Sequence, residues 1–296
     1  MIVAVTGGTG FVGRAVVKEL LERGHQVRIL SRKAPERLPE GASHVVGSVV
    51  TGEGLDSLVE GTEAVIHLVG IIKEVGENTF RAAHYNGTLN ILAASARAGV
   101  PRYLHMSAMG TRKDAVSQYH MTKYAAEEAV RASGLGWTIF RPSTIFGPGD
   151  AFINMLAAVM RKSPVMPVVG GGKNLMQPVY VKDVGAAFRK ALDSDVHIGK
   201  TYELGGPDLL NLKQILVKVS HVIELKRLFI SIPLWVVSPV VKSAQLFKIP
   251  LPVTSDQLIM LGEDNIRTGG DPVEELGLDW TGFEEGIRTY LGPNRE

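Results

Sequence analysis

The sequence predicts an α/β protein with a Rossmann-type, doubly wound parallel sheet and a smaller C-terminal substrate lobe. Short β-branched runs alternate with helical patterns over the first half of the chain. These runs are nearly continuous in apolar residues, as expected when helices cover both faces of a sheet. Glycine accounts for 33 of the 296 residues, and much of it stands where a strand gives way to a loop, which favours tight crossings.

Six strands are expected in order, at residues 2–6, 26–31, 44–47, 64–69, 102–106 and 137–141. Residues 1–148 are therefore predicted to form one doubly wound unit, and residues 149–296 a smaller, partly helical lobe. Residues 177–204 have the pattern of a strand, a helix and a strand, and are predicted to return to the first sheet. In the second lobe, a helical stripe predicts core packing by Leu212, Ile215, Leu216, Val219, Val222 and Ile223.

Composition excludes several classes of function. The 32 Lys and Arg residues balance 30 Asp and Glu residues to a net charge of +2, and the cations are scattered, so a nucleic-acid partner is not expected. The absence of cysteine excludes disulfides, thiol nucleophiles and iron–sulfur ligation, and no metal site is predicted. Met1 leads directly into the first strand without a basic leader, which favours a cytoplasmic location.

A glycine motif follows the first strand. Gly7, Gly10 and Gly13 stand at every third position and open a helix. The first glycine permits a tight turn, the second lets a diphosphate approach the backbone, and the third lets the helix pack close to the strand. The motif predicts dinucleotide binding on the free amides of the helix start, in a turn that also contains Thr9, Phe11 and Val12.

The cofactor preference is predicted from the end of the second strand. An NAD-binding protein places an acid about 20 residues after the last glycine to bind the ribose hydroxyls. This chain has Arg32 and Lys33 there instead. Because these cations attract a 2′-phosphate that a carboxylate would repel, NADP (NADPH) is predicted in preference to NAD.

Three residues are candidates for catalysis. Tyr119 and Lys123 lie four residues apart, so they share one face of the helix that contains them. A neighbouring ammonium is expected to lower the pKa of the phenol from its usual value near 10, so that Tyr119 can exchange a proton with a substrate oxygen. Ser107, at the end of the fifth strand, is expected to hydrogen-bond the same oxygen.

On these motifs the chain resembles the short-chain dehydrogenase/reductase superfamily, in its extended and atypical branches of epimerase/dehydratase type. The resemblance covers about the first 205 residues. Within the superfamily, the stretches around His67 to Ile71, Phe80 to Thr88 and Gln177 to Val181 are similar to a subgroup typified by the NADPH-binding accessory subunit of respiratory complex I.

The resemblance implies that Ser107, Tyr119 and Lys123 form the catalytic set and that Lys123 also holds the nicotinamide ribose. It further implies cofactor contacts by Ser48, Val49, Leu68, Val69, Gly70, Pro142, Ser143 and Thr144, and a substrate side that includes His84, Phe146, Gln177 and Tyr180. Three residues depart from the pattern. His84 stands where asparagine is frequent, Ser48 replaces an acid, and Gln177 stands where a cation usually serves sugar-nucleotide substrates.

Two functions therefore stay open. One is an NADP(H)-dependent oxidoreductase that transfers hydride to or from a carbonyl or hydroxyl of a small-molecule substrate. The other is a non-catalytic NADPH-binding accessory or assembly subunit of a respiratory dehydrogenase. Residues 228–241 are more apolar than a solvated helix requires. They are interpreted either as core or lid of the second lobe, or as a peripheral contact for the inner face of a membrane or a membrane-bound complex.

Overall fold

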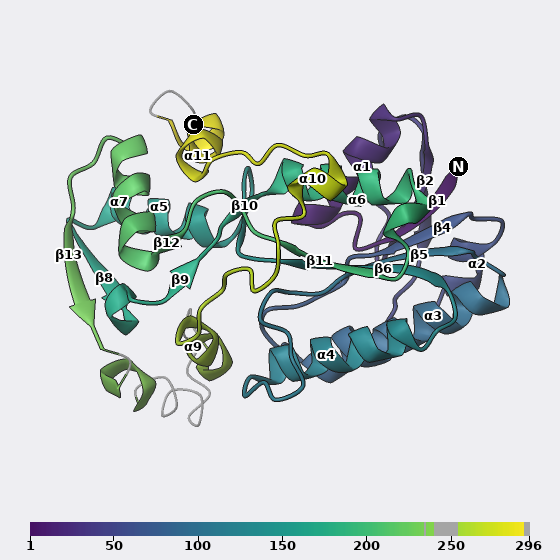
Figure 1. Ribbon diagram of the computed structural model, residues 1–296, viewed down its shortest axis with the longest axis horizontal. Coiled ribbons are helices and arrows are strands. Elements are labelled where there is room, and N and C mark those ends of the chain that lie inside the picture. The colour runs from purple at the N-terminus through teal and green to yellow at the C-terminus, as the bar shows by residue number, and fades with distance from the viewer. Residues whose placement is uncertain (234, 240–253, 293–296) are drawn as a thin grey trace. The chain divides into compact units, whose positions relative to one another are not determined.

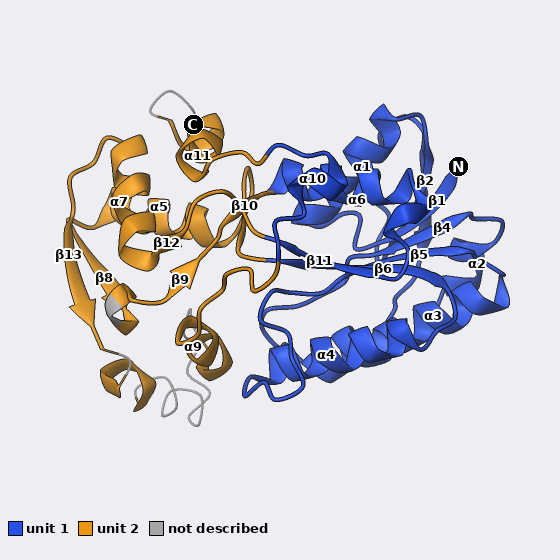
Figure 2. Cartoon of the chain, in the orientation of Figure 1, with its two compact units in different colours: residues 1–142, 181–204, 270–279 blue, residues 143–180, 205–269, 280–296 orange. Residues whose placement is uncertain are grey.

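The computed structural model describes residues 1–233, 235–239 and 254–292 (Figure 1). The chain divides into two compact units (Figure 2), which are residues 1–142, 181–204 and 270–279, and residues 143–180, 205–269 and 280–296. The first division lies at 142, six residues before the boundary expected from the sequence, and the chain returns to the first unit at 181. Residues 270–279 also belong to the first unit, which no pattern in the sequence predicts.

The first unit contains a seven-stranded parallel sheet in the order β11-β6-β5-β4-β1-β2-β3. Its strands are β1 (Ile2–Thr6), β2 (Gln26–Ser31), β3 (Ala42–Val46), β4 (Ala64–His67), β5 (Arg102–Met106), β6 (Gly136–Pro142) and β11 (Lys200–Leu204). The doubly wound α/β fold is confirmed. The strand order reverses between β1 and β4, so the loops that follow these two strands diverge there, and a nucleotide site is expected at this point.

Helices cover both faces of this sheet (Figure 1). On one face α1 (Phe11–Glu22) packs against α6 (Val181–Leu192), and a Cβ at Gly185 would lie 3.1 Å from the carbonyl oxygen of Ala15. On the other face lie α2 (Leu55–Val59), α3 (Gly87–Arg97) and α4 (Gln118–Arg131), whose apolar side chains form one core with β-strand residues. The short helices of this unit are η1 (Arg81–Asn86), η3 (Asp195–His197) and α10 (Val273–Leu276).

In its described residues, the second unit combines helices with three two-stranded sheets. The helices are α5 (Phe152–Lys162), η2 (Gly170–Gly172), α7 (Leu212–Val222), α9 (Ser255–Leu261) and α11 (Phe283–Leu291). The sheets pair β7 (Ile145–Phe146) with β10 (Val179–Tyr180), β9 (Leu175–Met176) with β12 (Leu210–Asn211), and β8 (Val165–Val169) with β13 (Leu228–Ile232). The predicted apolar stripe of α7 is buried, because it supplies the face of the helix that packs into this unit.

The apolar segment 228–241 is only partly described. Residues 234, 240 and 241 lie outside the described residues. Residues 228–232 form the strand β13, and residues 235–239 are helical. None of the helices formed by the described residues combines the length and the apolar composition that crossing a bilayer requires.

Candidate cofactor and active site

The glycine motif forms a tight turn between β1 and α1. Gly7 has a φ of +75°, in the left-handed region that favours glycine, and the Gly10 amide donates to its carbonyl oxygen at 3.0 Å. A Cβ at Gly13 would overlap that oxygen and lie 2.6 Å from the Cα of Gly8. The first turn of α1 contains no acid, and its N-cap, Gly10, has no side-chain acceptor. The helix start therefore keeps amides that fit a diphosphate.

The loop after β4 connects this turn with the catalytic candidates. The backbone of Leu68 and Val69 is so close to Gly7 that a Cβ there would meet both at 3.2 Å. A Cβ at Gly70 would lie 3.0 Å from the Nζ atom of Lys123. Leu68, Val69 and Gly70 thus run from the glycine turn to Lys123 along the carboxyl edge of the sheet.

Arg32 and Lys33, the two cations predicted to bind the 2′-phosphate of NADP, come immediately after β2. Arg32 and Lys33 are exposed, and neither forms an ion pair with another described residue. Ser31 donates to the carbonyl oxygen of Lys33 at 2.6 Å and so shapes this turn. On the neighbouring strand end, Ser48 accepts a hydrogen bond from the amide of Val50, while the Val49 side chain is buried.

Lys123 is a buried cation on α4. Its side chain is 2% exposed, and Nζ donates to the Met106 carbonyl oxygen at 2.9 Å. Burial lowers the pKa of Lys123 to about 8, against the opposing effect of Glu127 one turn further along the helix. For Tyr119 the expectation of a lowered pKa is wrong, because burial raises the pKa of the phenol to about 12. The cause is desolvation, which disfavours the charged phenolate.

His84 fastens the loop after β4 to α4. Its Nδ1 lies 3.0 Å from the Thr122 hydroxyl, which donates its own proton to the helix backbone, and its Nε2 lies 3.0 Å from the Ile71 amide. Nε2 also lies 3.1 Å from the Ile71 carbonyl oxygen, so this nitrogen can accept from the amide or donate to the carbonyl, depending on the tautomer. Burial and then the charge of Lys123 lower the pKa of His84 to about 2. The ring also meets Tyr119 edge-to-face at 5.2 Å between centroids, so His84 is a neighbour of the catalytic candidates.

Ser107 lies among buried polar groups at the end of β5. Its hydroxyl donates to that of Thr111 at 3.5 Å, and Ser107 helps to lower the pKa of the Glu127 carboxyl. Only 3% of the residue is exposed. A contact between Ser107 and a substrate oxygen would require its hydroxyl to turn away from these partners.

Glu127 is a buried residue of the site that the sequence analysis did not single out. It is fully buried and accepts two hydrogen bonds from Arg141, at 2.8 and 2.6 Å, and one from Arg131 at 2.7 Å. Burial alone would raise the pKa of Glu127, but Arg141 and the other partners lower it overall. The signal for this residue was its position four residues after Lys123 on the same helix face.

The remaining predicted site residues are divided between the units. Pro142 ends β6 in the first unit. In the second unit, the Ser143 hydroxyl and the Thr144 amide both donate to the Oδ1 atom of Asn265. Gln177 accepts from the amide of Arg267 at 2.7 Å.

Phe146 and Tyr180 were expected on the substrate side. Phe146 is fully buried, with ring centroids 4.8 Å from Phe283 and 5.4 Å from Tyr180, and Tyr180 is 3% exposed. Both rings are therefore part of the core of the second unit.

Two histidines on neighbouring strands, β4 and β5, lie in the core below the carboxyl edge of the sheet. His67 is held by the hydroxyls of Thr6 at 2.6 Å and Thr88 at 3.2 Å, and burial lowers its pKa to about 3. His105 stacks on His67 at 5.5 Å, and neither of its ring nitrogens has a hydrogen-bond partner among the described residues. The ring nitrogens of His67 are thus paired, whereas those of His105 are not paired with any residue that the structure describes.

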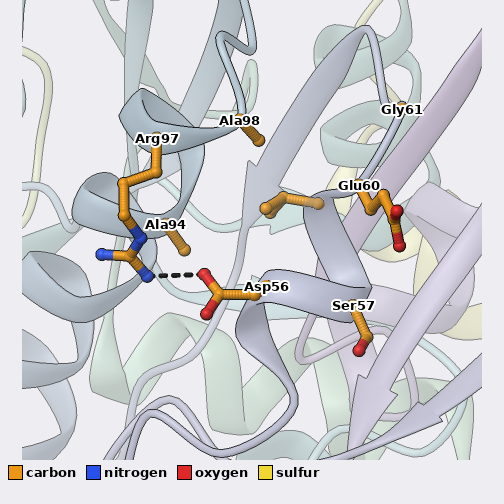
Figure 3. Close-up of a pocket in the computed structure, with 8 residues that line it drawn as sticks. Asp56, Ser57, Glu60, Gly61, Ala94, Arg97 and Ala98 are labelled. Carbon is orange, nitrogen blue, oxygen red and sulfur yellow. Dashed lines mark hydrogen bonds and ion pairs between the residues drawn. The ribbon is translucent and has the colours of Figure 1, made fainter.

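A hollow of about 490 Å³ lies away from these residues (Figure 3). It opens between the ends of α2 and α3, beside the ion pair of Asp56 and Arg97 at 2.5 Å. Both helices end there before entering the next strand, so the hollow lies at the amino edge of the sheet. None of its lining residues belongs to the predicted site. In the described part of the chain, no group of three or more His, Asp or Glu side chains could hold a metal ion.

Comparisons with known proteins agree with this geometry. The NAD dependent epimerase/dehydratase family matches residues 3–205. NADH dehydrogenase (ubiquinone) 1 alpha subcomplex subunit 9, mitochondrial, of Arabidopsis thaliana is 31% identical in an alignment of 290 positions that covers 94% of this chain and 72% of that protein. Ceramide reductase of Caulobacter vibrioides is 34% identical over 188 residues, which are 62% of this chain and 59% of that protein.

A solved structure shares the whole fold. The crystal structure of gox2253 superimposes with a TM-score of 0.77 and 26% sequence identity, covering 97% of this chain and 96% of that one. The family match includes the glycine turn, Lys123 and the sheet up to β11, which is well over half of the chain. The chain therefore belongs to the NAD dependent epimerase/dehydratase family.

Proposed function

We propose that this protein is an NADP(H)-dependent oxidoreductase that reduces a carbonyl of a small, apolar substrate, or oxidises the corresponding hydroxyl. The observation that carries the proposal is the close approach of Lys123 to Gly70, at the carboxyl edge of the sheet that also holds the glycine turn. A nucleotide on that edge and a proton donor on α4 would then serve the same substrate. The relative named ceramide reductase supports a reductase with an apolar substrate.

The protonation states of Tyr119 and Lys123 suit reduction. When bound, NADPH supplies a hydride. With a pKa of about 12, Tyr119 is protonated at neutral pH and can donate its proton to the oxygen that becomes a hydroxyl. Lys123, with a pKa of about 8, is charged at neutral pH and stabilises the phenolate left behind. Ser107 would hold the substrate oxygen once its hydroxyl turns from Glu127.

The test is NADPH oxidation by the purified protein with a panel of aldehydes, ketones and quinones. We expect Tyr119→Phe to reduce the rate by about 10²–10⁴-fold, because it removes the proton donor. Tyr124→Phe, which removes a phenol from the next turn of the same helix, is the matched control and should keep the parent rate. Equal rates for Tyr119→Phe and the parent would overturn the mechanism.

A second function has support of its own. We propose as the alternative a non-catalytic, NADPH-holding accessory or assembly subunit of a respiratory NADH dehydrogenase, in the cytoplasm at the inner face of the membrane. Its support is the relative named as a subunit of that complex, aligned over 94% of this chain, and the near-complete burial of Ser107, which is 3% exposed. Co-purification from membranes with dehydrogenase subunits is expected in that case. Recovery only as a free protein would contradict it.

A further inference from the structure

The β8–β13 pair of the second unit presents one face made of apolar side chains. The strands are parallel, and their register places Val165 beside Leu228, Pro167 beside Ile230, and Val169 beside Ile232. Figure 1 shows the two strands side by side. Because side chains alternate between the two faces of a strand, these residues share one face. We call this set the ribbon face: Val165, Pro167, Val169, Leu228, Ile230 and Ile232.

The ribbon face is open, whereas the opposite side is packed along β8 but not at Ser231 of β13, which is exposed. Met166 and Val168, which point the other way from β8, are 3% and 0% exposed. On the ribbon face, by contrast, Leu228 is 61% and Ile230 48% exposed. Trp235, shortly after β13, is 77% exposed. A contiguous exposed apolar surface of this kind is typical of an interaction site.

Cations stand at one end of the ribbon face without acidic partners in the same segments. Arg161 and Lys162 immediately precede the loop into β8, and Lys226 and Arg227 immediately precede β13. The Leu228 amide donates to the Pro164 carbonyl oxygen at 3.0 Å, so the two strands start side by side. Arg227 donates to the carbonyl oxygen of Met160 at 2.6 Å. Residues 151–182 and 225–255 contain no Asp or Glu.

We propose that the ribbon face docks on the surface of a lipid bilayer that contains anionic phospholipids. The apolar side chains and Trp235 would enter the headgroup region, where tryptophan is enriched. The four cations would contact anionic headgroups. A second copy of the same face fits poorly, since it brings further cations and no acid from these segments to pair with them.

The test is sedimentation of the full-length protein with vesicles. We expect it to sediment with vesicles that contain phosphatidylglycerol, to stay in solution with phosphatidylcholine alone, and to be released as salt rises. Ile230→Asp places an anion on the ribbon face and should abolish sedimentation. Val196→Asp, at a valine that is 61% exposed in the first unit, is the matched control and should bind as the parent does.

The charge contribution is tested separately. Reversing both Arg161 and Lys162 to Glu should weaken vesicle binding by at least about 25-fold, since each cation near an anionic surface contributes about fivefold. Trp235→Phe should still sediment but lose the quenching of tryptophan emission by brominated lipid. NADPH binding must stay unchanged in every variant, which shows that the variants are folded and that the result is independent of the proposed reductase activity.

Three results would overturn the proposal. The first is no sedimentation of the parent with anionic vesicles. The second is equal sedimentation of Ile230→Asp and Val196→Asp. The third is a parent dimer that does not bind vesicles and that Ile230→Asp converts to monomers, which would assign the ribbon face to a second copy of the chain.

Discussion

At the scale of single residues, Lys123 sets a pH limit on the proposed reaction. Its charge is present at neutral pH and is lost as the pH rises through about 8. We expect kcat/KM for NADPH-dependent reduction to fall above about pH 8, because the phenolate of Tyr119 then loses its counter-charge. The measurement is the pH profile of the initial rate.

A substitution of Glu127 provides a second test of the pH profile. It opposes the effect of burial on the pKa of Lys123, so Glu127→Gln should move the alkaline fall to lower pH while Glu128→Gln, at an exposed position of the same helix, should not. A rate that stays flat to pH 10 would exclude Lys123 as the charged partner. Since the folded pKa of Lys123 lies below its usual value of 10.5, this group should also make the fold more stable as the pH rises from about 8 toward 10.5.

Arg32 is expected to determine the choice between the two nicotinamide nucleotides. Removing one charged hydrogen bond costs about 1.5–3 kcal/mol, so Arg32→Ala should weaken NADPH binding by roughly 10- to 150-fold and leave NADH binding nearly unchanged. Fluorescence titration with both nucleotides measures this difference. Arg97→Ala, at the amino edge of the sheet, is the control. Equal losses of affinity for NADPH and NADH would contradict a contact between Arg32 and the 2′-phosphate.

At the scale of elements, the turn into α1 depends on Gly13. An added methyl group would overlap the Gly7 carbonyl oxygen and approach the Gly8 Cα at 2.6 Å, and these backbone atoms cannot move without opening the turn. We expect Gly13→Ala to destabilise the fold by about 1–3 kcal/mol and to abolish NADPH binding. Thermal unfolding and fluorescence titration measure the two effects. Gly270→Ala, where a Cβ would meet nothing within 4 Å, should change neither.

The elements that sequence could predict are those with a strong local pattern. The six expected strands lie within two residues of the observed ones, because each is a short apolar run bounded by turn residues. The stripe of α7 was equally clear. Segment 228–241 was not, because a nearly uniform apolar run has neither helical nor strand periodicity, and its pairing with β8 joins residues more than 60 positions apart. Its first part, residues 228–232, is a strand.

The candidate site shows the same limit at residue level. Glycine spacing and the four-residue separation of Tyr119 and Lys123 are local, and they could be read directly. The lowered pKa of Glu127 depends on Arg141, which lies fourteen residues later on a strand. The raised pKa of Tyr119 depends on burial by the surrounding fold. Such properties arise from contacts between distant segments, and the sequence pattern does not contain them.

At the scale of the whole molecule, buried neutral histidines predict sensitivity to acid. Burial lowers the pKa of His67 to about 3 and of His84 to about 2, and it lowers that of His105 well below its usual value. Only the unfolded chain takes up these protons as the pH falls below about 6.5, so stability falls by about 1.4 kcal/mol per pH unit for each histidine. Urea unfolding between pH 7.5 and 5.5 measures this slope.

The contribution of one histidine can be isolated. His84→Asn should reduce the slope by about 1.4 kcal/mol per pH unit, because it removes one group that only the unfolded chain protonates. His221→Asn, at an exposed position of the second unit, should leave the slope as it is. A stability that does not change over this range would mean that water reaches these rings in the folded state.

The division of the first unit into three stretches of chain has a consequence for synthesis on the ribosome. Strand β6 ends at Pro142, but its neighbour β11 begins only at Lys200. At ~5–20 residues per second, translation of the roughly sixty intervening residues takes about 3–12 s. Over that interval the nascent sheet lacks its β11 edge, and α1 lacks its partner α6. The growing chain therefore has a period in which chaperones could protect it, and a stalled or truncated product would carry an open, aggregation-prone strand.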